Sequence, residues 1–195
     1  MGALDEAPRV FAEDRATWHA WLEANHATAR SAWLVTWRRG HGPALDYEDA
    51  VEEALCFGWV DGQAGRADEH LGKLYFAPRK PATGWSASNK ARIERLQAAG
   101  LLAPAGIASV ERAKANGAWT ALDDIEAGVI PPDLAAALAA SPPATIHFEA
   151  FPKSVRRQIL YWIGQAKRPE TRAARILETA TLAARNERAN VRPER

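Results

Sequence analysis

Strand-like patterns in this chain are confined to residues 31–79, and this confinement limits the fold more than any other feature of the sequence. Alternating residues rich in tryptophan, valine and tyrosine occur in SAWLVTWRR, WVDGQ and KLYFAPR, and the last two predict a hairpin or meander. Elsewhere apolar residues recur at helical spacing. The sequence therefore predicts an α+β fold, in which a small antiparallel sheet packs with helices and a mostly helical C-terminal half follows.

Helix signals and a change in composition divide the chain into three parts. Apolar periodicity, capping residues and glycines predict helices over residues 14–25, from 46 to 58, and over 85–100, 103–117, 154–166 and 169–186. Residues 118–145 are rich in Asp, Ala and Pro, although PPDLAAALAA within them predicts a short helix. We therefore expect an α+β body over residues 1–120, a linker with a short helix over 121–145, and a helical C-terminal module over 146–195.

Composition and charge indicate a soluble protein of the cytoplasm. Hydrophobic residues make up 47% of the chain and charged residues 25%, which is typical of globular proteins. No apolar run approaches the roughly 20 residues that a membrane helix needs. The acidic N-terminal segment has no apolar signal core, and a single cysteine cannot form an internal disulfide. We expect no membrane span.

The segment ALCFGWVDGQ raises the question of a nucleophile, because it places the only cysteine, Cys56, near Asp61. Cys56 lies at the C-terminal end of a predicted helix, beside Glu52 and Glu53. The negative end of the helix dipole and the two carboxylates each raise the pKa of its thiol. We expect Cys56 to be a small residue under another layer, and we predict no catalytic residue. Asp61 lies at a predicted strand end, where it bonds turn amides, pairs with an arginine or contacts a ligand.

The segment PRKPATGWSASNK combines cations, a helix start and an indole. A helix N-terminus with nearby cations is suited to an anion, and an indole adds a stacking surface. The candidate ligand-binding residues are Arg79, Lys80, Trp85, Ser86, Asn89 and Lys90. The alternative is structural: Ser86 is a plain N-cap, Trp85 packs into the core, and the cations are solvated.

Positive charge is concentrated at the C-terminal end of the chain. Residues 151–195 carry 11 Lys/Arg and 4 Asp/Glu, a net charge of +7, whereas residues 1–150 carry 14 and 20, a net charge of −6. Arg168, Arg172 and Arg175 share one stripe of a predicted helix, where they either hold phosphates or carboxylates or are paired with acids and water.

The five histidines lack metal-ligand spacing and no glycine-rich phosphate loop occurs, so we predict no metal and no cofactor.

Five segments together resemble the YdeI/OmpD-associated family, also labelled bacteriocin-protection proteins. These segments are ALCFGWVDGQ, PRKPATGWSASNK, LLAPAG, ERAKANGAW and YWIGQAKRPETRAARI, and the resemblance runs roughly from Trp18 to Ala184. It implies a small α+β protein with a helical C-terminal module and an association with tolerance of antimicrobial peptides or bacteriocins. The resemblance brings no catalytic residues.

Three functional hypotheses follow from the sequence. The favoured one is a non-catalytic protein that binds a small anionic or phosphorylated ligand through the segment Arg79–Lys90, together with Asp61 and the arginine stripe. A second is a nucleic-acid or acidic-surface binder that uses the basic C-terminal module. A third is an enzyme with a site near Asp61. The sequence does not fix the oligomeric state.

Overall fold

The structure, a computed structural model, describes residues 6–191. The chain divides into two compact units, residues 1–120 and residues 121–195. The first five residues of the acidic N-terminal segment, and Arg192 and Arg195 of the basic C-terminal segment, lie outside the described residues. A sheet in the first unit and helices in both units confirm the predicted α+β class.

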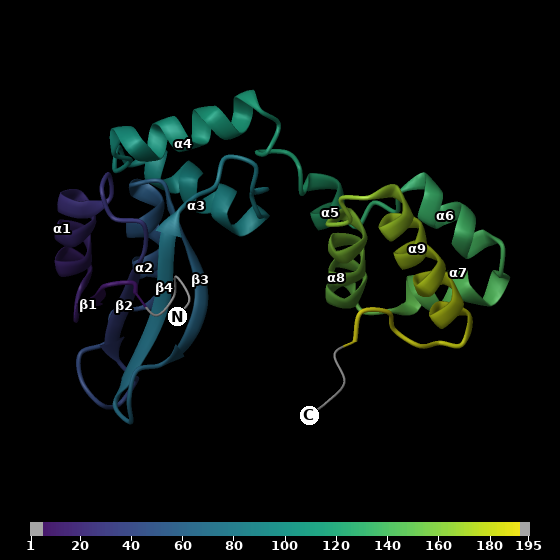
Figure 1. Ribbon diagram of the computed structural model, residues 1–195, viewed down its shortest axis with the longest axis horizontal. Coiled ribbons are helices and arrows are strands. Elements are labelled where there is room, and N and C mark those ends of the chain that lie inside the picture. The colour runs from purple at the N-terminus through teal and green to yellow at the C-terminus, as the bar shows by residue number, and fades with distance from the viewer. Residues whose placement is uncertain (1–5, 192–195) are drawn as a thin grey trace. The chain divides into compact units, whose positions relative to one another are not determined.

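The first unit is a mixed four-stranded sheet with helices. Its elements are β1 (Arg9–Phe11), α1 (Arg15–Asn25), β2 (Ala32–Trp37), α2 (Tyr47–Cys56), β3 (Trp59–Arg66), β4 (Leu71–Pro78), α3 (Ala87–Ala98) and α4 (Pro104–Ala115). The strand order is β1-β2-β4-β3, with β4 between β2 and β3 (Figure 1). The antiparallel β3–β4 pair is the predicted hairpin. The antiparallel β2–β4 pair and the parallel β1–β2 edge pair were not predicted individually.

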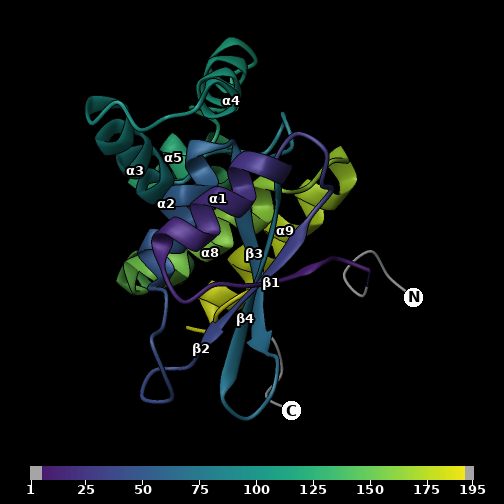
Figure 2. The same cartoon turned by 90° about the vertical axis from the view of Figure 1, so that its left-hand side faces the viewer.

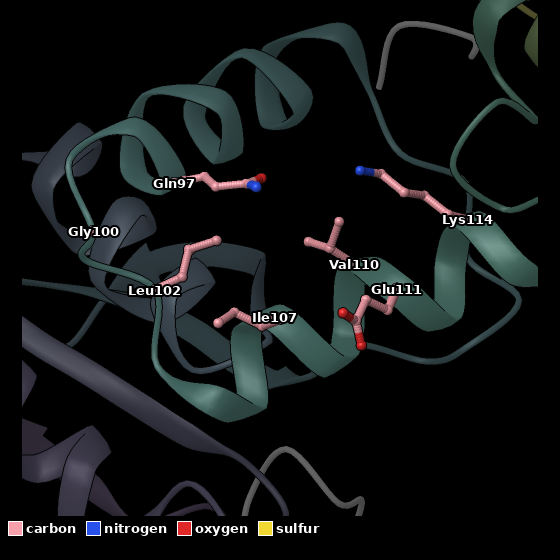
Figure 3. A pocket seen from close by; sticks show the side chains of 7 residues that line it. All are labelled: Gln97, Gly100, Leu102, Ile107, Val110, Glu111 and Lys114. Atoms are coloured by element: carbon pink, nitrogen blue, oxygen red, sulfur yellow. The ribbon is translucent and has the colours of Figure 1, made fainter.

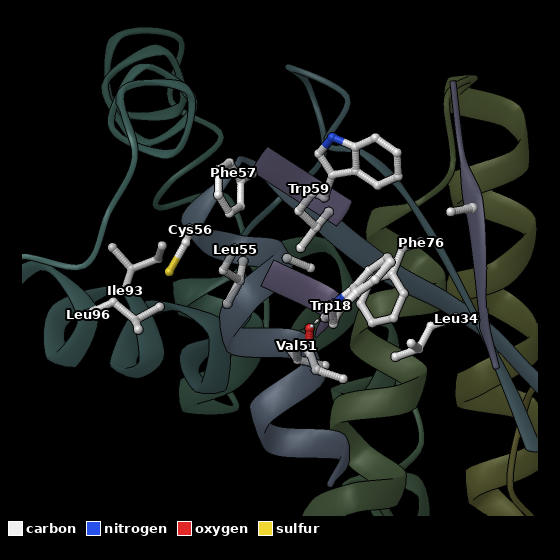
Figure 4. Packing of buried hydrophobic residues seen from close by; sticks show 14 of the residues in the cluster. Trp18, Leu34, Val51, Leu55, Cys56, Phe57, Trp59, Phe76, Ile93 and Leu96 are labelled. Atoms are coloured by element: carbon white, nitrogen blue, oxygen red, sulfur yellow. Dashed lines mark hydrogen bonds between the residues drawn. The ribbon is translucent and has the colours of Figure 1, made fainter. Parts of the chain in front are cut away.

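Helices α1 and α2 pack against each other beside the sheet (Figure 2). Trp18 of α1, Leu55 of α2 and Phe76 of β4 are almost completely buried and belong to one core (Figure 4). The indole Nε1 of Trp18 donates to the backbone oxygen of Ala50 at 3.1 Å, so this buried polar group is satisfied. Four of the eight tryptophans are buried, and the other four are partly buried.

The C-terminal end of α2 lies against the beginning of α4. The backbone oxygen of Cys56 accepts a hydrogen bond from the amide of Ala103 at 3.1 Å. A Cβ at Gly106 would lie 2.3 Å from the same oxygen, so only glycine allows this approach. Gly58 ends α2 with a φ of 73°, a conformation that favours glycine. These contacts fix the chain just before β3 begins.

The second unit is helical. It contains α5 (Asp123–Ala127), α6 (Pro132–Ala139), α7 (Pro142–Ala150), α8 (Lys153–Gly164) and α9 (Pro169–Ala184), and α9 packs against α6, α7 and α8. Leu134 and Leu138 of α6, Phe148 of α7 and Ile163 of α8 are buried in its core. Residues 121–145, which the sequence analysis assigns to a linker, thus hold α5, α6 and the start of α7, and the predicted short helix is α6.

Candidate functional site

Arg79 is a buried cation directly after β4. Its side chain is 8% exposed, and the centre of its guanidinium lies 3.9 Å from the centroid of the Trp85 ring. Its Nη2 donates to the backbone oxygens of Thr83 and Gly84. Its Nε is buried and has no hydrogen-bond partner in the described part of the chain, nor does any carboxylate there form an ion pair with this residue. Burial lowers the pKa of Arg79 to about 10, so the side chain is still charged at neutral pH.

Asp61 is the acidic residue whose charge acts on Arg79. The residue is the third of β3, opposite Phe76 of β4, and its Oδ2 accepts a hydrogen bond from Tyr47 Oη at 2.8 Å. Its charge opposes the effect of burial on the pKa of Arg79. Burial and the bond to Asp61 raise the pKa of Tyr47 to about 12, so Tyr47 stays a donor at neutral pH. Asp61 therefore pairs with a tyrosine and faces an arginine across a longer distance.

Arg92 of α3 binds one of the predicted site residues, Asn89, and also pairs with Glu48. Its Nε donates to Glu48 Oε2 at 2.9 Å, its Nη2 to Glu48 Oε1 at 2.6 Å and its Nη1 to Asn89 Oδ1 at 2.8 Å. The bond from Arg92 lowers the pKa of Glu48. The backbone amide of Asn89 donates to Ser86 Oγ at 3.3 Å, so Ser86 is the N-cap of α3. Asn89 and Ser86 thus both make contacts within the first unit.

Trp119, rather than Trp85, presents a partly exposed indole. Trp85 is 1% exposed, and its ring lies 5.0 Å from that of Trp119 between centroids. The ammonium groups of Lys90 and Lys114 lie 5.5 and 5.2 Å from the centroid of the Trp119 ring. Trp119 belongs to ERAKANGAW, a segment whose spacing alone gave no sign of a site. Lys80 is exposed, and its backbone oxygen accepts from the amide of Thr83 at 3.0 Å, which closes a turn.

The predicted arginine stripe belongs to the second unit and is partly used there. Arg172 donates to both oxygens of Asp133, at 2.7 and 2.9 Å. Arg175 donates to the backbone oxygen of Trp162, with its guanidinium 4.9 Å from the centroid of that ring. Arg168 is exposed at the N-cap position of α9. The ten predicted residues therefore divide between the units, seven in the first and three in the second. In the first unit Asp61 bonds to Tyr47, Arg79 stacks on Trp85, and Asn89 contacts Ser86 and Arg92, whereas Lys80 only closes a turn. Tyr47, Arg92 and Trp119 were not predicted.

Cys56 is not activated as a nucleophile. It is 1% exposed, and Figure 4 shows its sulfur directed toward Ile93 of α3. Burial, followed by the charges of Glu53 and Glu52, raises the thiol pKa to about 12, against the opposing charge of Arg15. The expectation of a small residue under another layer is confirmed.

The described residues lack two features, a metal-binding cluster and a membrane-spanning helix. Within residues 6–191, no group of three or more His, Cys, Asp or Glu side chains is arranged to hold a metal ion. Among the same residues, none of the helices combines the length and the apolar character needed to cross a membrane.

Comparison with known proteins identifies two family segments. Residues 10–109, just over half of the chain, match the model of a domain of unknown function, DUF8412. Residues 127–186 match the family described as "Bacteriocin-protection, YdeI or OmpD-Associated", which confirms that resemblance for the segment containing YWIGQAKRPETRAARI. No curated protein and no solved structure matches the chain. The chain therefore belongs to the DUF8412 family through residues 10–109 and carries a YdeI/OmpD-associated segment over residues 127–186.

Proposed function

We propose that this protein is a non-catalytic binding protein of the cytoplasm, whose first unit binds a small carboxylate or phosphate with Arg79 as the main cation. One observation carries the proposal: a guanidinium that is 8% exposed has no carboxylate partner among the described residues and leaves its Nε without an acceptor. Burying an unpaired charge is unfavourable, and an entering anion supplies the missing counter-charge and acceptor.

The surroundings of Arg79 favour an anion over other ligands. Lys80 lies beside Arg79 in the chain. The positive end of the α3 dipole is at the start of that helix, where Ser86 is the N-cap and Ser88 lies in the first turn. The exposed turn at residues 80–83 directly follows Arg79 in the chain. Asp61 holds Arg79 charged and also repels excess negative charge, so a monoanion binds better than a dianion at this position.

The arginine stripe of the second unit is not required by this proposal. The family that residues 127–186 match is described as bacteriocin-protecting, and we propose that anion binding contributes to tolerance of antimicrobial peptides or bacteriocins. The two alternative functions, nucleic-acid binding and catalysis, can each be tested. A nucleic-acid binder shows affinity for a DNA duplex that falls steeply with salt, and an enzyme loses turnover in Asp61→Asn.

The test is a thermal-shift and calorimetric titration of the full chain with acetate and inorganic phosphate. A ligand bound only by the folded protein raises the melting temperature by mass action. We expect a saturable response that Arg79→Met abolishes and Arg79→Lys partly retains, because lysine keeps the charge but not the planar group of donors.

The matched control is Arg30→Met, which removes an exposed arginine of the same unit and leaves the response unchanged. An equal response in wild type and Arg79→Met would refute the proposed site. A salt-sensitive response to a DNA duplex, with none to either small anion, would transfer the function to the basic C-terminal segment.

A further inference from the structure

A pocket of about 310 Å³ opens between α3 and α4, away from the residues that the anion proposal uses. Its lining residues are Gln97, Gly100, Leu102, Ile107, Val110, Glu111 and Lys114 (Figure 3). This volume is at the lower end of the range for ligand sites, roughly 300–1,000 Å³, and suits a molecule of amino-acid size. None of these lining residues was among the candidate site residues predicted from the sequence.

The pocket is formed by a connection that is fixed at both of its ends. Gly100 ends α3 with a φ of 69°, and the amide of Leu101 donates to the backbone oxygen of Leu96 at 3.0 Å. The amide of Ala103 donates to the backbone oxygen of Cys56 at 3.1 Å, just before α4 begins. The two helices are therefore held apart by backbone contacts, and a ligand does not have to create the space.

The floor of the pocket is apolar. Val110 is 5% exposed, Leu102 is partly buried against the core, and Ile107 is 44% exposed. Figure 3 shows the side chains of Leu102 and Val110 pointing into the space between the helices, with Ile107 along the same side. Burying this apolar surface under a small apolar group removes it from water and so favours binding.

Polar groups face this floor from two sides. Figure 3 shows the amide of Gln97 and the ammonium group of Lys114 entering the same space from opposite sides, while the carboxylate of Glu111 points elsewhere. Within residues 6–191, the side chains of Gln97 and Glu111 form no hydrogen bond or ion pair, and Lys114 lies over the face of Trp119. Two donors thus converge above an apolar floor, and one acid stands at the rim.

We propose that this pocket binds a small apolar monocarboxylate. Its carboxylate accepts hydrogen bonds from Lys114 Nζ and the Gln97 amide, and its hydrocarbon part covers Leu102, Ile107 and Val110. Glu111 selects against a second negative charge, which disfavours phosphates and dicarboxylates. Both sites accept a monocarboxylate, but this pocket adds an apolar floor and disfavours phosphate. The inference does not depend on the Arg79 site.

The experiment is an NMR titration of the full, ¹⁵N-labelled chain with 4-methylpentanoate. We expect saturable shifts of the amides of Gly100, Leu102, Ile107 and Val110, with a Kd of about 1 mM for so small a ligand. The uncharged 4-methylpentanamide is expected to bind about tenfold more weakly, because it lacks the charge that Lys114 recognises. Equal binding of acid and amide, or the absence of saturable shifts at these amides, would overturn the proposal.

Four variants separate this pocket from other anion sites. Lys114→Met is expected to weaken binding of 4-methylpentanoate about tenfold, and the matched Lys90→Met, which removes the other lysine over Trp119, leaves it unchanged. Glu111→Gln is expected to admit the dicarboxylate pentanedioate. Arg79→Met removes the response assigned to Arg79, whereas the 4-methylpentanoate shifts at the amides of Gly100, Leu102, Ile107 and Val110 are expected to persist. Equal losses in Lys114→Met and Lys90→Met would contradict the inference.

Discussion

The two units bury different kinds of side chain. In the first unit, Glu53, Arg79 and Arg92 lie below 10% exposure, within and beside a core rich in tryptophan. In the described part of the second unit, the core consists of alanine, leucine, isoleucine and phenylalanine, and Thr179 is the buried polar residue. A buried charge is unfavourable unless it is paired with another charge or binds a ligand. We therefore expect the ligand-binding site in the first unit. The second unit is held together by ordinary helix packing.

The largest expected effect tests whether the two cores fold independently. Phe148→Ala and Phe76→Ala each remove a completely buried ring, one from each core, and each is expected to destabilise its own unit by about 3–5 kcal/mol. Seven of the eight tryptophans lie in residues 1–120. Phe148→Ala should therefore shift the unfolding transition seen by far-UV circular dichroism and leave most of the tryptophan fluorescence transition in place.

The control for this comparison is Ile146→Ala, since Ile146 lies on the same helix as Phe148 but is 67% exposed. We expect it to change stability by less than about 0.5 kcal/mol. A common shift of both probes in Phe148→Ala would show that the units unfold as one, and the distinction between two cores would then have no thermodynamic meaning.

The next effect is a pH dependence confined to the first unit. Folding raises the pKa of the Cys56 thiol from 9.0 to about 12, so between these values the folded state holds a proton that the unfolded state has lost. The free energy of unfolding therefore falls as the pH rises through this window, by about 1.4 kcal/mol per pH unit at most. Below pH 9 the contribution is fully present.

Urea unfolding at pH 8 and pH 10, followed by tryptophan fluorescence, measures this term. Wild type is expected to lose about 1.4 kcal/mol more than Cys56→Ala between the two pH values. Other groups that titrate in this range, including Tyr47, are common to both proteins and cancel in the difference. Identical pH dependence in wild type and Cys56→Ala would mean that the thiol is not held in its protonated form by the fold.

Much of the first unit could be predicted from the sequence because its signals are local. The alternation in residues 32–37 predicts β2, Ser86 marks the start of α3, and Gly58 ends α2. The three residues of β1 are too few to show a period, and its parallel pairing with β2 depends on a distant segment. In residues 121–145, PPDLAAALAA predicts α6, but α5 and the start of α7 were not predicted, because their few apolar residues show no helical period and are covered by other helices of the unit.

The candidate site was harder to predict than the fold, because its members meet through tertiary contacts. The cation Arg79 and the acid Asp61 were singled out from their segments, but nothing local shows that Tyr47 bonds to Asp61 across 14 positions. Nor does local sequence show that Trp85 is covered while Trp119 is partly exposed. Burial of a tryptophan is decided by what packs on it, and spacing along one helix carries no information about that.

The smallest expected effect concerns the arginines of the second unit. Arg172 and Asp133 form an ion pair at 2.7 Å, with side chains that are 33% and 47% exposed. Because water and salt screen such a pair, a double-mutant cycle of Arg172→Met and Asp133→Asn is expected to give a coupling of about 0.2–1 kcal/mol. Folding lowers the pKa of Asp133, chiefly through the bond from Arg172, so the coupling is present at neutral pH and lost as the pH falls through that lowered value.

The matched variant is Arg168→Met, which removes an exposed arginine of the same stripe and should show no coupling to Asp133. Raising the salt concentration from about 0.1 to 1 M shortens the screening length from roughly 10 to 3 Å, and the Arg172–Asp133 coupling should shrink accordingly. A coupling well above 1 kcal/mol that resists salt would mean that the second unit also relies on desolvated charge. The contrast between a unit with two arginines below 10% exposure and a unit whose described arginines are all more exposed would then have to be abandoned.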